Sequence, residues 1–406
     1  MSRRLRILLL NQYLPPDAAA TAFRLADLAQ DLARDHEVWV VAGRPSYNPG
    51  QETFRDQSVR VVRVGSTTFP RTTMWGRAAN YLSFLSAAAA RALTLPRPDV
   101  VVAMTDPPVI GVVGALVARR RRARFVQVYM DSYPDVAIAL HRADNPALVW
   151  VWRRLNGYVR RTADRIVVIG RDMRERLLAQ GVPDAKIVVR PNWAADEPVS
   201  AEDVATARTA RGWDGLFVLM FAGNLGLAQG LDALVAAAAR LRDHPGLRFV
   251  LVGDGAAKAR LERRAAELGL SNLEFLPYVP QDEARVLAAA ADAHVITLAP
   301  GLLGTATPGK VYSIMAAGKP FVAAVERGSE IDRMVRDHGC GIRVDPGDAV
   351  ALSDAVLSLR GRPDAGEMGR RGRAAFEASY TREAATRTYR ELLEELSTGS
   401  PDLEQR

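Results

Sequence analysis

The sequence predicts an α/β protein built from two doubly wound sheets. Short apolar runs alternate with longer helical patterns along nearly the whole chain, as in parallel sheets with helical crossovers. The cycle begins at Arg6–Asn11 and begins again at Leu216–Ala222. With 406 residues the chain is long enough for two domains of common size. We expect Rossmann-like domains at residues 1–195 and 196–375, then a C-terminal helix within 376–406 that packs back towards the first domain and ends in a frayed tail.

The composition is that of a soluble globular protein. Hydrophobic residues make up 48% of the chain and charged residues 25%. The single cysteine, Cys340, leaves no intrachain disulfide, which predicts a cytosolic setting. Because glycines flank Cys340, we interpret it as a buried small residue in a turn before a strand rather than as a nucleophile. No secretory signal precedes the first strand, and no apolar run reaches the ~20 residues of a transmembrane helix.

The charge pattern argues against nucleic acid as a partner. The formal net charge is +8, but the arginines are scattered among acids and lack interleaved aromatics. The exception is the run Arg119–Arg124, which is either a solvated surface or a patch for anionic lipid headgroups. A helix predicted at Met74–Leu95 has apolar residues spread broadly around it. Such a helix is more often buried against a sheet than laid on a bilayer, and membrane-surface contact is the second interpretation.

Seven apolar runs in the first half are predicted strands. The first leads into a small-residue loop and a helical pattern at Thr21–Arg34, the opening unit of a doubly wound sheet. This loop has no G-x-G-x-x-G, so the fingerprint of a dinucleotide site is absent. The strands are Arg6–Asn11, Glu37–Ala42, Val59–Val64, Val100–Met104, Phe125–Tyr129, Arg165–Ile169 and Lys186–Val189.

Acidic residues follow two of these strands. Asp106 comes after Val100–Met104, and Asp131 comes after Phe125–Tyr129. In a doubly wound sheet the carboxyl ends of the strands line the ligand crevice, so both carboxylates are placed to face it. An N-cap of the next helix is an equally consistent interpretation of Asp131.

Glycine loops follow the strands of the second half. Gly223 to Gly226 come after Leu216–Ala222, and Gly253 to Gly255 come after a strand at Arg248–Val252. A further strand is predicted at Leu273–Leu276. Taken singly, each glycine loop is ordinary turn chemistry.

The most informative stretch runs from Thr297 to Pro320. An apolar strand ends near Leu298, a loop of Gly, Thr and Pro follows, and a helix opens at Lys310. Free amides, hydroxyls and an ammonium at a helix N-terminus suit phosphate, because the macrodipole favours an anion there. The groups that would provide them belong to Thr305, Ala306, Thr307, Gly309 and Lys310. An ordinary strand–loop–helix connection is the alternative.

The order of the second-half motifs resembles one family. AGNLGLAQGLDAL (222–234), LVGDG (251–255), NLEFLPYV (272–279), ADAHVITLAP (291–300) and TPGKVYSIMAAGKP (307–320) are similar to the nucleotide-sugar-binding domain of retaining glycosyltransferases with the GT-B fold. The closest resemblance is to family 4, and within it to bacterial surface-polysaccharide enzymes similar to the fucosamine transferases of O-antigen synthesis. NQYLPPDAAATA (11–22), RPSYNPG (44–50), TDPP (105–108) and KIVVRPNW (186–193) sit where that family has its acceptor domain and interdomain passage.

This resemblance implies two domains facing across a cleft, with a nucleoside-diphosphate sugar as the donor. It implies no cofactor and no metal. The implied catalytic residues are Asp131 and Lys310. The implied donor-binding residues are Gly223, Asn224, Gln229, Gly253, Leu276, Tyr278, Thr305, Thr307, Gly309, Lys310 and Ser313. The implied acceptor-side residues are Pro16, Ala18, Ala19, Thr21 and Asp106.

The sequence departs from the family pattern at charged positions. Relatives carry two Glu eight positions apart, and these positions fall here on Thr305 and Ser313. Gln229 falls where many relatives have a phosphate-binding Lys, and Met130 lies near the place of a His. Neutral groups bind hydroxyls more weakly than carboxylates do, so ribose recognition should be weaker or differently built.

The predicted reaction is transfer of a sugar from a nucleoside diphosphate to an acceptor hydroxyl, with retention implied by the resemblance. It serves a cell-surface glycan or a glycosylated metabolite, and the acceptor is a sugar, a lipid-linked or a small molecule. We expect a cytoplasmic protein, with a peripheral place at the inner face of the membrane as a variant. The alternatives are a non-catalytic nucleotide-sugar-binding partner subunit and an epimerase of similar fold. The five His are scattered away from the predicted strand-end loops, which counts against an epimerase.

Overall fold

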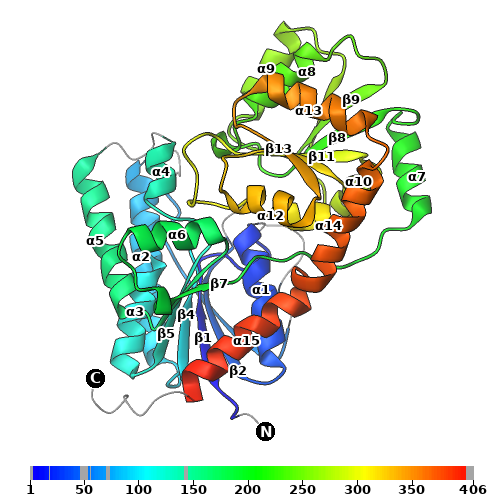
Figure 1. Ribbon diagram of the computed structural model, residues 1–406. Coiled ribbons are helices and arrows are strands. Elements are labelled where there is room, and N and C mark those ends of the chain that lie inside the picture. Colours follow the sequence, from blue (N-terminus) through cyan, green and yellow to red (C-terminus); the bar gives the residue numbers. More distant parts are fainter. Residues whose placement is uncertain are drawn as a thin grey trace. The chain divides into compact units, whose positions relative to one another are not determined.

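The computed structural model describes residues 3–17, 19–45, 54, 56–69, 74–140 and 145–398. The chain forms two compact units (Figure 1). Unit 1 contains the chain to Ile169, then Met173–Pro191 and the last helix from Glu383. Unit 2 contains Gly170–Asp172 and Asn192–Arg382. Each unit has its own parallel sheet with helices on both faces, so the predicted α/β class is confirmed.

The sheet of unit 1 has seven parallel strands in the order β3-β2-β1-β4-β5-β6-β7. The central strand β1 pairs with β2 on one side and with β4 on the other, where Leu8 lies opposite Trp39 and Val101. The strand order therefore reverses between β1 and β4. Doubly wound sheets bind ligands at the carboxyl ends of the strands at such a point, and we call this place the crevice of the unit. The strands are β1 (Arg6–Leu10), β2 (Glu37–Gly43), β3 (Val59–Val64), β4 (Val100–Ala103), β5 (Arg124–Tyr129), β6 (Arg165–Val168) and β7 (Ile187–Val189).

Helices cover both faces of this sheet. Helices α2, α3 and α5 lie side by side on one face, and α1 packs on β2 and β3 (Figure 1). The last helix, α15, contacts α1: the Thr386 hydroxyl donates to Asp31 Oδ2 at 3.0 Å, and Arg390 pairs with Asp35 at 3.2 Å. The helices are α1 (Ala20–Ala33), α2 (Met74–Thr94), α3 (Ile110–Arg121), α4 (Asp135–Ala139), α5 (Pro146–Thr162), α6 (Arg171–Ala179) and α15 (Arg382–Thr398).

The sheet of unit 2 has six parallel strands in the order β10-β9-β8-β11-β12-β13. Its order reverses between β8 and β11, which defines a second crevice of the same kind. The strands are β8 (Phe217–Ala222), β9 (Leu247–Val252), β10 (Leu273–Leu276), β11 (Ala293–Thr297), β12 (Phe321–Ala324) and β13 (Gly341–Val344). The helices are α7 (Ala201–Ala210), α8 (Asp232–Arg240), α9 (Lys258–Glu267), α10 (Gln281–Ala290), α11 (Lys310–Ala316), α12 (Glu330–His338), α13 (Ala349–Gly361) and α14 (Ala365–Ser379).

The central strands read as continuous apolar runs because both faces of each sheet are covered. In unit 2 the residues Phe221, Phe249 and Val295 are at most 1% exposed and belong to one core cluster. Cys340 is 0% exposed and directly precedes β13, as predicted. Burial raises the pKa of its thiol to about 11, so it is a packing residue.

The C-terminal helical segment is divided. It breaks at Tyr380 and Thr381, so the last helix begins at Arg382 rather than at 376. Thr381 forms a bridge with Ala194, and Ala194 donates its amide to Tyr380 O at 3.2 Å. This backbone pairing competes with helical hydrogen bonding at 380–381, which the helical periodicity of the sequence does not reveal.

The two features proposed for a membrane surface meet only at the C-terminal end of the helix. Crossover helices run antiparallel to the strands, so Arg119–Arg122 at the end of α3 lie at the amino-end edge of the sheet. In the same run Arg121 donates to Leu95 O at 2.7 Å, and Arg124 pairs with Asp164 at 2.9 Å. The start of α2 lies at the opposite, carboxyl edge, where Trp75 is 81% exposed. The run therefore lies beside the C-terminal end of α2 and at the opposite edge of the sheet from the exposed Trp75.

Candidate active site

In unit 2 the crevice is floored by two glycines that no other residue can replace without strain. Gly223 follows β8 with φ 130°, and Gly253 follows β9 with φ 137°. A Cβ at Gly253 would lie 2.1 Å from the carbonyl oxygen of Gly223. Both positions therefore need glycine for the close approach of two strand ends. The glycine loops predicted from the sequence form this floor, beyond their role as turns.

Lys310 lies over this floor. A Cβ at Gly223 would lie 3.7 Å from Lys310 Nζ, so the glycine leaves room beside the ammonium. The Lys310 Nζ lies 3.2 Å from the centre of the Phe221 ring and donates to Gln229 Oε1 at 3.5 Å. Among the described residues no carboxylate lies within ion-pair distance of it. Burial lowers the pKa of Lys310 well below its usual value. The ring face and the neutral amide do not replace the hydration that the ammonium has in water.

The loop before Lys310 has some polar groups that are hydrogen-bonded and some that have no acceptor or partner among the described residues. The amides of Gly309 and Lys310 donate to no acceptor among the described residues. Thr307 Oγ1 is buried and has no hydrogen-bond partner among those residues. Thr305 is wholly buried, and its hydroxyl donates to Leu302 O at 2.8 Å inside the loop. The structure thus turns Thr305 into the loop, while Thr307 and Gly309 lie beside Lys310.

The other predicted donor residues lie around the same strand ends. Asn224 and Tyr278 are exposed, and Tyr278 is 63% exposed. Leu276 is half-buried at the end of β10, and its carbonyl accepts from the Gly253 amide at 3.1 Å. Ser313 is exposed on α11, three positions after Lys310 and hence on the same side of that helix.

One carboxylate near this loop was not singled out from the sequence. Glu326 follows β12, and its Oε2 accepts from the Leu303 amide at 2.8 Å. It lies in the turn after a strand with no motif around it, so only the fold brings it to the loop. The positions expected for an acidic pair, 305 and 313, carry neutral side chains, which leaves Glu326 as a carboxylate that fixes the loop.

In unit 1 the crevice between β1 and β4 holds carboxylates. Thr21 Oγ1 at the start of α1 donates to Asp106 Oδ2 at 2.5 Å. Asp106 is held in place by its own backbone, because its amide donates to Asn11 Oδ1 at 3.1 Å and its carbonyl accepts from the Gln12 amide at 2.7 Å. Burial raises the pKa of Asp106, and the Thr21 hydroxyl opposes that rise. Thr21 and Asp106, which are two of the predicted acceptor-side residues, are thus in contact.

Asp131 lies one strand further, after β5. Burial first and the nearby Asp106 second raise its pKa to about 7. Burial first, and then Asp131 and Asp106, raise the pKa of the Tyr133 hydroxyl, so the three groups are neighbours. The next helix, α4, begins at Asp135 with Pro134 as its N-cap. The N-cap interpretation of Asp131 is therefore wrong.

The loop after β1 is anchored from β3. Arg63 donates to Gly43 O at 2.8 Å and also to the carbonyls of Leu14 and Pro15. This fixes the backbone that leads to Pro16 and Ala19, which are both half-buried. The predicted acceptor-side residue Ala18 lies outside the described residues.

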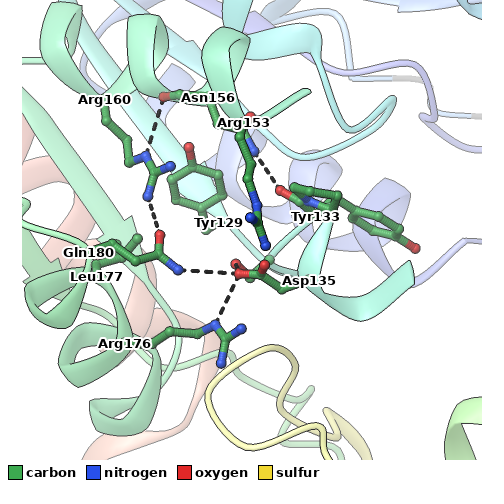
Figure 2. Close-up of a pocket in the computed structure, with 11 residues that line it drawn as sticks. Tyr129, Tyr133, Asp135, Arg153, Asn156, Arg160, Arg176, Leu177 and Gln180 are labelled. Atoms are coloured by element: carbon green, nitrogen blue, oxygen red, sulfur yellow. Dashed lines mark hydrogen bonds and ion pairs between the residues drawn. The ribbon is translucent and has the colours of Figure 1, made fainter. Parts of the chain in front are cut away.

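A cavity of about 400 Å³ opens in unit 1 beyond the end of β5 (Figure 2). It is lined by arginines from α5 and α6, which the sequence analysis did not single out. Asp135 accepts from Arg176 Nε at 3.0 Å and from Gln180 Nε2 at 3.3 Å, and Gln180 in turn accepts from Arg160 (Figure 2). These residues escaped the sequence analysis because they are spread over two helices with no motif between them.

The described part of the chain has neither a candidate metal site nor a helix that could span a membrane. No group of three or more His, Cys, Asp and Glu side chains is placed there to hold a metal ion. No helix of that part is long and apolar enough to cross a membrane.

Comparison with known proteins identifies the family. Residues 20–193 match the model described as a glycosyl transferase 4-like domain, and residues 217–361 match glycosyl transferases group 1. The probable glycosyltransferase WbjE of Pseudomonas aeruginosa is 30% identical over 293 residues, which are 70% of this chain and 72% of WbjE. The putative colanic acid biosynthesis glycosyl transferase WcaI of Escherichia coli is 32% identical over 194 residues, which are 47% of each chain.

Solved structures share the fold. HepE of Anabaena, solved in complex with UDP and glucose, has a TM-score of 0.75 at 19% identity, covering 96% of this chain and 99% of HepE. Sucrose-phosphate synthase of Thermosynechococcus elongatus has a TM-score of 0.77 at 20% identity, covering 98% of this chain and 100% of that one. At such identities the likeness shows the fold. The chain belongs to the family 4-like glycosyltransferases of the GT-B fold.

Proposed function

We propose that this chain transfers a sugar from a nucleoside-diphosphate sugar to an acceptor hydroxyl during assembly of a cell-surface polysaccharide. Transfer proceeds with retention at the anomeric carbon and without a metal. WbjE and WcaI support the setting, since one is named a probable glycosyltransferase and the other a putative transferase of colanic acid biosynthesis. HepE, whose fold this chain shares, was solved with UDP and with UDP-glucose, which supports a nucleotide-sugar donor.

The observation that carries the proposal is the setting of Lys310. Its ammonium has a ring face and a neutral amide as neighbours, and burial disfavours its charge. A buried cation without a counter-charge is costly, and a diphosphate would supply that charge. The free amides of Gly309 and Lys310 point to the same ligand. Stabilising the departing diphosphate is the main electrostatic demand of the reaction, so Lys310 also serves the chemical step.

Unit 1 provides the acceptor side of the proposal. Asp131 and Asp106 lie at the strand ends of its crevice, and Thr21 holds Asp106. A carboxylate there orients the acceptor hydroxyl or stabilises the oxocarbenium-like charge that develops on the donor sugar. Pro16 and Ala19 line the loop on the same side of the sheet.

The test is a donor panel with the full chain. UDP-, GDP- and dTDP-sugars are incubated without acceptor, and release of nucleoside diphosphate is measured. We expect slow release from one nucleotide class, suppressed in Lys310→Ala and unchanged by EDTA. The anomeric proton signal of the product formed with an acceptor then reports retention. No release and no binding of any donor overturns the proposal.

Two other outcomes identify the rival functions. Tight donor binding without turnover, even with acceptor, favours a non-catalytic subunit, for which the neutral residues at 305 and 313 are the motive. Recovery of an epimerised donor favours an epimerase. That reaction needs an acid–base pair, and His294 is a poor candidate because burial lowers its pKa to about 4.

We also propose a cytoplasmic protein that reaches the inner membrane face by the carboxyl edge of unit 1. Trp75 on α2 and Trp150 on α5 are 81% and 62% exposed at that edge, while Arg119 lies at the other edge. Sedimentation with anionic vesicles tests this. Trp75→Ala with Trp150→Ala should weaken vesicle binding more than Arg119→Gln with Arg120→Gln at ~0.15 M salt, where screening acts beyond about 8 Å. Wild type that stays free of the vesicles excludes the membrane surface.

A further inference from the structure

The cavity beyond β5 in unit 1 has an excess of positive charge. Three of its lining residues are arginines and one is a carboxylate, Asp135. Asp135 is already occupied, since it accepts from Arg176, from Gln180 and from the Ser132 hydroxyl. Arg176 and Asp135 thus compensate each other, which leaves Arg153 and Arg160 to be explained.

Among the residues that the structure describes, these two arginines have no anionic partner. Arg160 donates to the Asn156 carbonyl at 3.3 Å and to the Gln180 side-chain carbonyl, and both acceptors are neutral. Arg153 has no hydrogen bond or ion pair with any described residue. Figure 2 shows Arg153, Arg160 and Arg176 directed into the same space from α5 and α6. A single structural ion pair between α4 and α6 needs only Arg176, so it does not account for the other two.

The cavity adjoins the acidic site of unit 1. Tyr133 lines the cavity, and its hydroxyl pKa is raised by burial first and then by Asp131 and Asp106. Ser132 and Tyr133 line the cavity and directly follow Asp131 in the chain. A ligand anchored on the arginines would therefore extend towards the two carboxylates.

An exposed apolar surface lies next to the cavity. The first turns of α5 expose Leu148, Trp150 and Val151 at 44%, 62% and 44%. Arg153 follows Trp150 by three positions, so the two side chains leave the helix on neighbouring sides. Exposed apolar residues beside a cationic cavity suit a ligand that carries both an anionic group and an apolar part.

We propose that this cavity binds a phosphate or diphosphate group of the acceptor, held by Arg153 and Arg160. The proposal rests on the glycosyl transfer proposed above, because it names the chemistry of the acceptor. Guanidinium groups bind phosphate oxygens through paired charge-assisted hydrogen bonds, and Arg153 and Arg160 have donors to spare. A volume of about 400 Å³ is within the range of small-molecule sites.

The first experiment measures binding of inorganic pyrophosphate by calorimetry. All proteins carry Lys310→Ala, so that the donor site of unit 2 does not contribute. We expect Arg153→Gln and Arg160→Gln each to weaken binding at least about tenfold. Arg154→Gln is the matched control, because Arg154 lies over the Trp150 ring at 5.4 Å and does not line the cavity. Equal affinity in all variants, or no binding at millimolar pyrophosphate, overturns the proposal.

The same set of variants also shows whether a loss of binding comes from misfolding. Arg153 has no partner to lose within the described part of the chain, so Arg153→Gln should keep the unfolding midpoint of its parent. Arg160→Lys keeps the charge and should retain more affinity than Arg160→Gln. A loss of binding that follows the midpoint rather than the charge also overturns the proposal.

A second arm identifies the source of the phosphate. Farnesyl diphosphate is compared with pyrophosphate and with farnesol. A diphosphate that binds more tightly with its lipid chain, in a way that Trp150→Ala reduces, shows a lipid-linked acceptor. Equal affinity for both diphosphates shows a soluble phosphorylated acceptor, and binding of farnesol alone contradicts an anion site.

The two proposals fail differently. If the cavity is not an acceptor site, Arg153→Gln leaves the acceptor KM unchanged in an enzyme that still turns over its donor. If the glycosyl transfer itself is wrong, no donor is turned over, while pyrophosphate binding to the cavity is still lost in Arg153→Gln.

Discussion

The two crevices share a topology and differ in charge. Each lies where the strand order of a parallel sheet reverses, between β1 and β4 in unit 1 and between β8 and β11 in unit 2. In unit 2 the crevice is built from glycines and one uncompensated lysine, Lys310. In unit 1 it is built from Asp106 and Asp131, whose pKa values are raised. The same frame thus holds an anion-seeking site and an acidic site.

The difference shows how one topology can hold two chemically different sites. A glycine floor lets a ligand approach the backbone, and Lys310 then meets its charge, which suits a diphosphate. A buried carboxylate titrating near neutrality suits a hydroxyl group and a developing positive charge. The fold alone does not decide which crevice has which role. The residues at the strand ends decide it.

The largest effect should follow from Gly253→Ala. The new Cβ would lie 2.1 Å from the Gly223 carbonyl oxygen, at a φ of 137° that side chains rarely adopt. We expect a loss of roughly 2–6 kcal/mol in stability, together with loss of nucleotide binding. Chemical unfolding followed by circular dichroism measures it. Gly309→Ala is the control, since a Cβ there meets nothing within 4 Å. If both variants unfold alike, the glycine floor does not constrain unit 2.

Lys310→Ala should weaken nucleoside-diphosphate binding by ~1.5–3 kcal/mol and leave binding of the nucleoside almost unchanged. The diphosphate should also raise the lowered pKa of Lys310, so binding of wild type takes up protons at neutral and alkaline pH. Calorimetry in buffers of different ionisation enthalpy measures this uptake.

Two variants sharpen the assignment of Lys310. Lys310→Arg keeps the charge at all accessible pH and should bind without proton uptake. Lys319→Ala changes a lysine at the other end of α11 and should bind as wild type does. Equal diphosphate affinity in wild type and Lys310→Ala removes Lys310 from the site.

Much of this contrast could be predicted from sequence, because it depends on local patterns. Periodicity and strand-end punctuation indicated both sheets, and they placed Asp106 and Asp131 after strands and Lys310 at the start of a helix. The setting of Lys310 against Phe221 could not be predicted, since those residues are 89 positions apart and meet only in the folded sheet. The arginine cavity could not be predicted for the same reason, because its residues come from α5 and α6, which carry no motif. Thr305 was expected beside the donor, and a hydrogen bond to Leu302 holds it inside the loop; its role in the donor site stays a prediction.

Asp131→Asn should lower turnover by about 10²–10⁴-fold and change the pH dependence. With a pKa of about 7, wild-type turnover rises with pH through neutrality if the ionised form acts. Asp106→Asn removes one cause of the shift, so its turnover profile should move to lower pH. If Asp106→Asn does not move the pH profile of turnover, Asp106 does not contribute to the raised pKa of Asp131.

The raised pKa of Asp131 also predicts how the stability of the protein changes with pH. An ordinary Asp ionises near 3.9, so between that pH and about 7 the unfolded chain loses a proton that the folded chain keeps. The stability of wild type therefore falls over this window and levels off above it. Asp131→Asn should raise the unfolding midpoint at pH 8 and leave it nearly unchanged at pH 4. The reverse order would show that Asp131 is stabilised as a carboxylate.

Ser313→Glu should have the smallest effect, and it tests how far unit 2 follows its family. Ser313 is exposed on α11, three positions after Lys310. If it faces the ribose, a carboxylate there should tighten binding of the nucleoside by ~1 kcal/mol, because charged acceptors hold hydroxyls more strongly. The nucleoside diphosphate should gain less, since a carboxylate at this spacing also pairs with Lys310 and competes with phosphate. Ser313→Gln matches the size without the charge and should do neither. Calorimetry with both ligands decides: if Ser313→Glu changes neither affinity, residue 313 does not face the nucleotide.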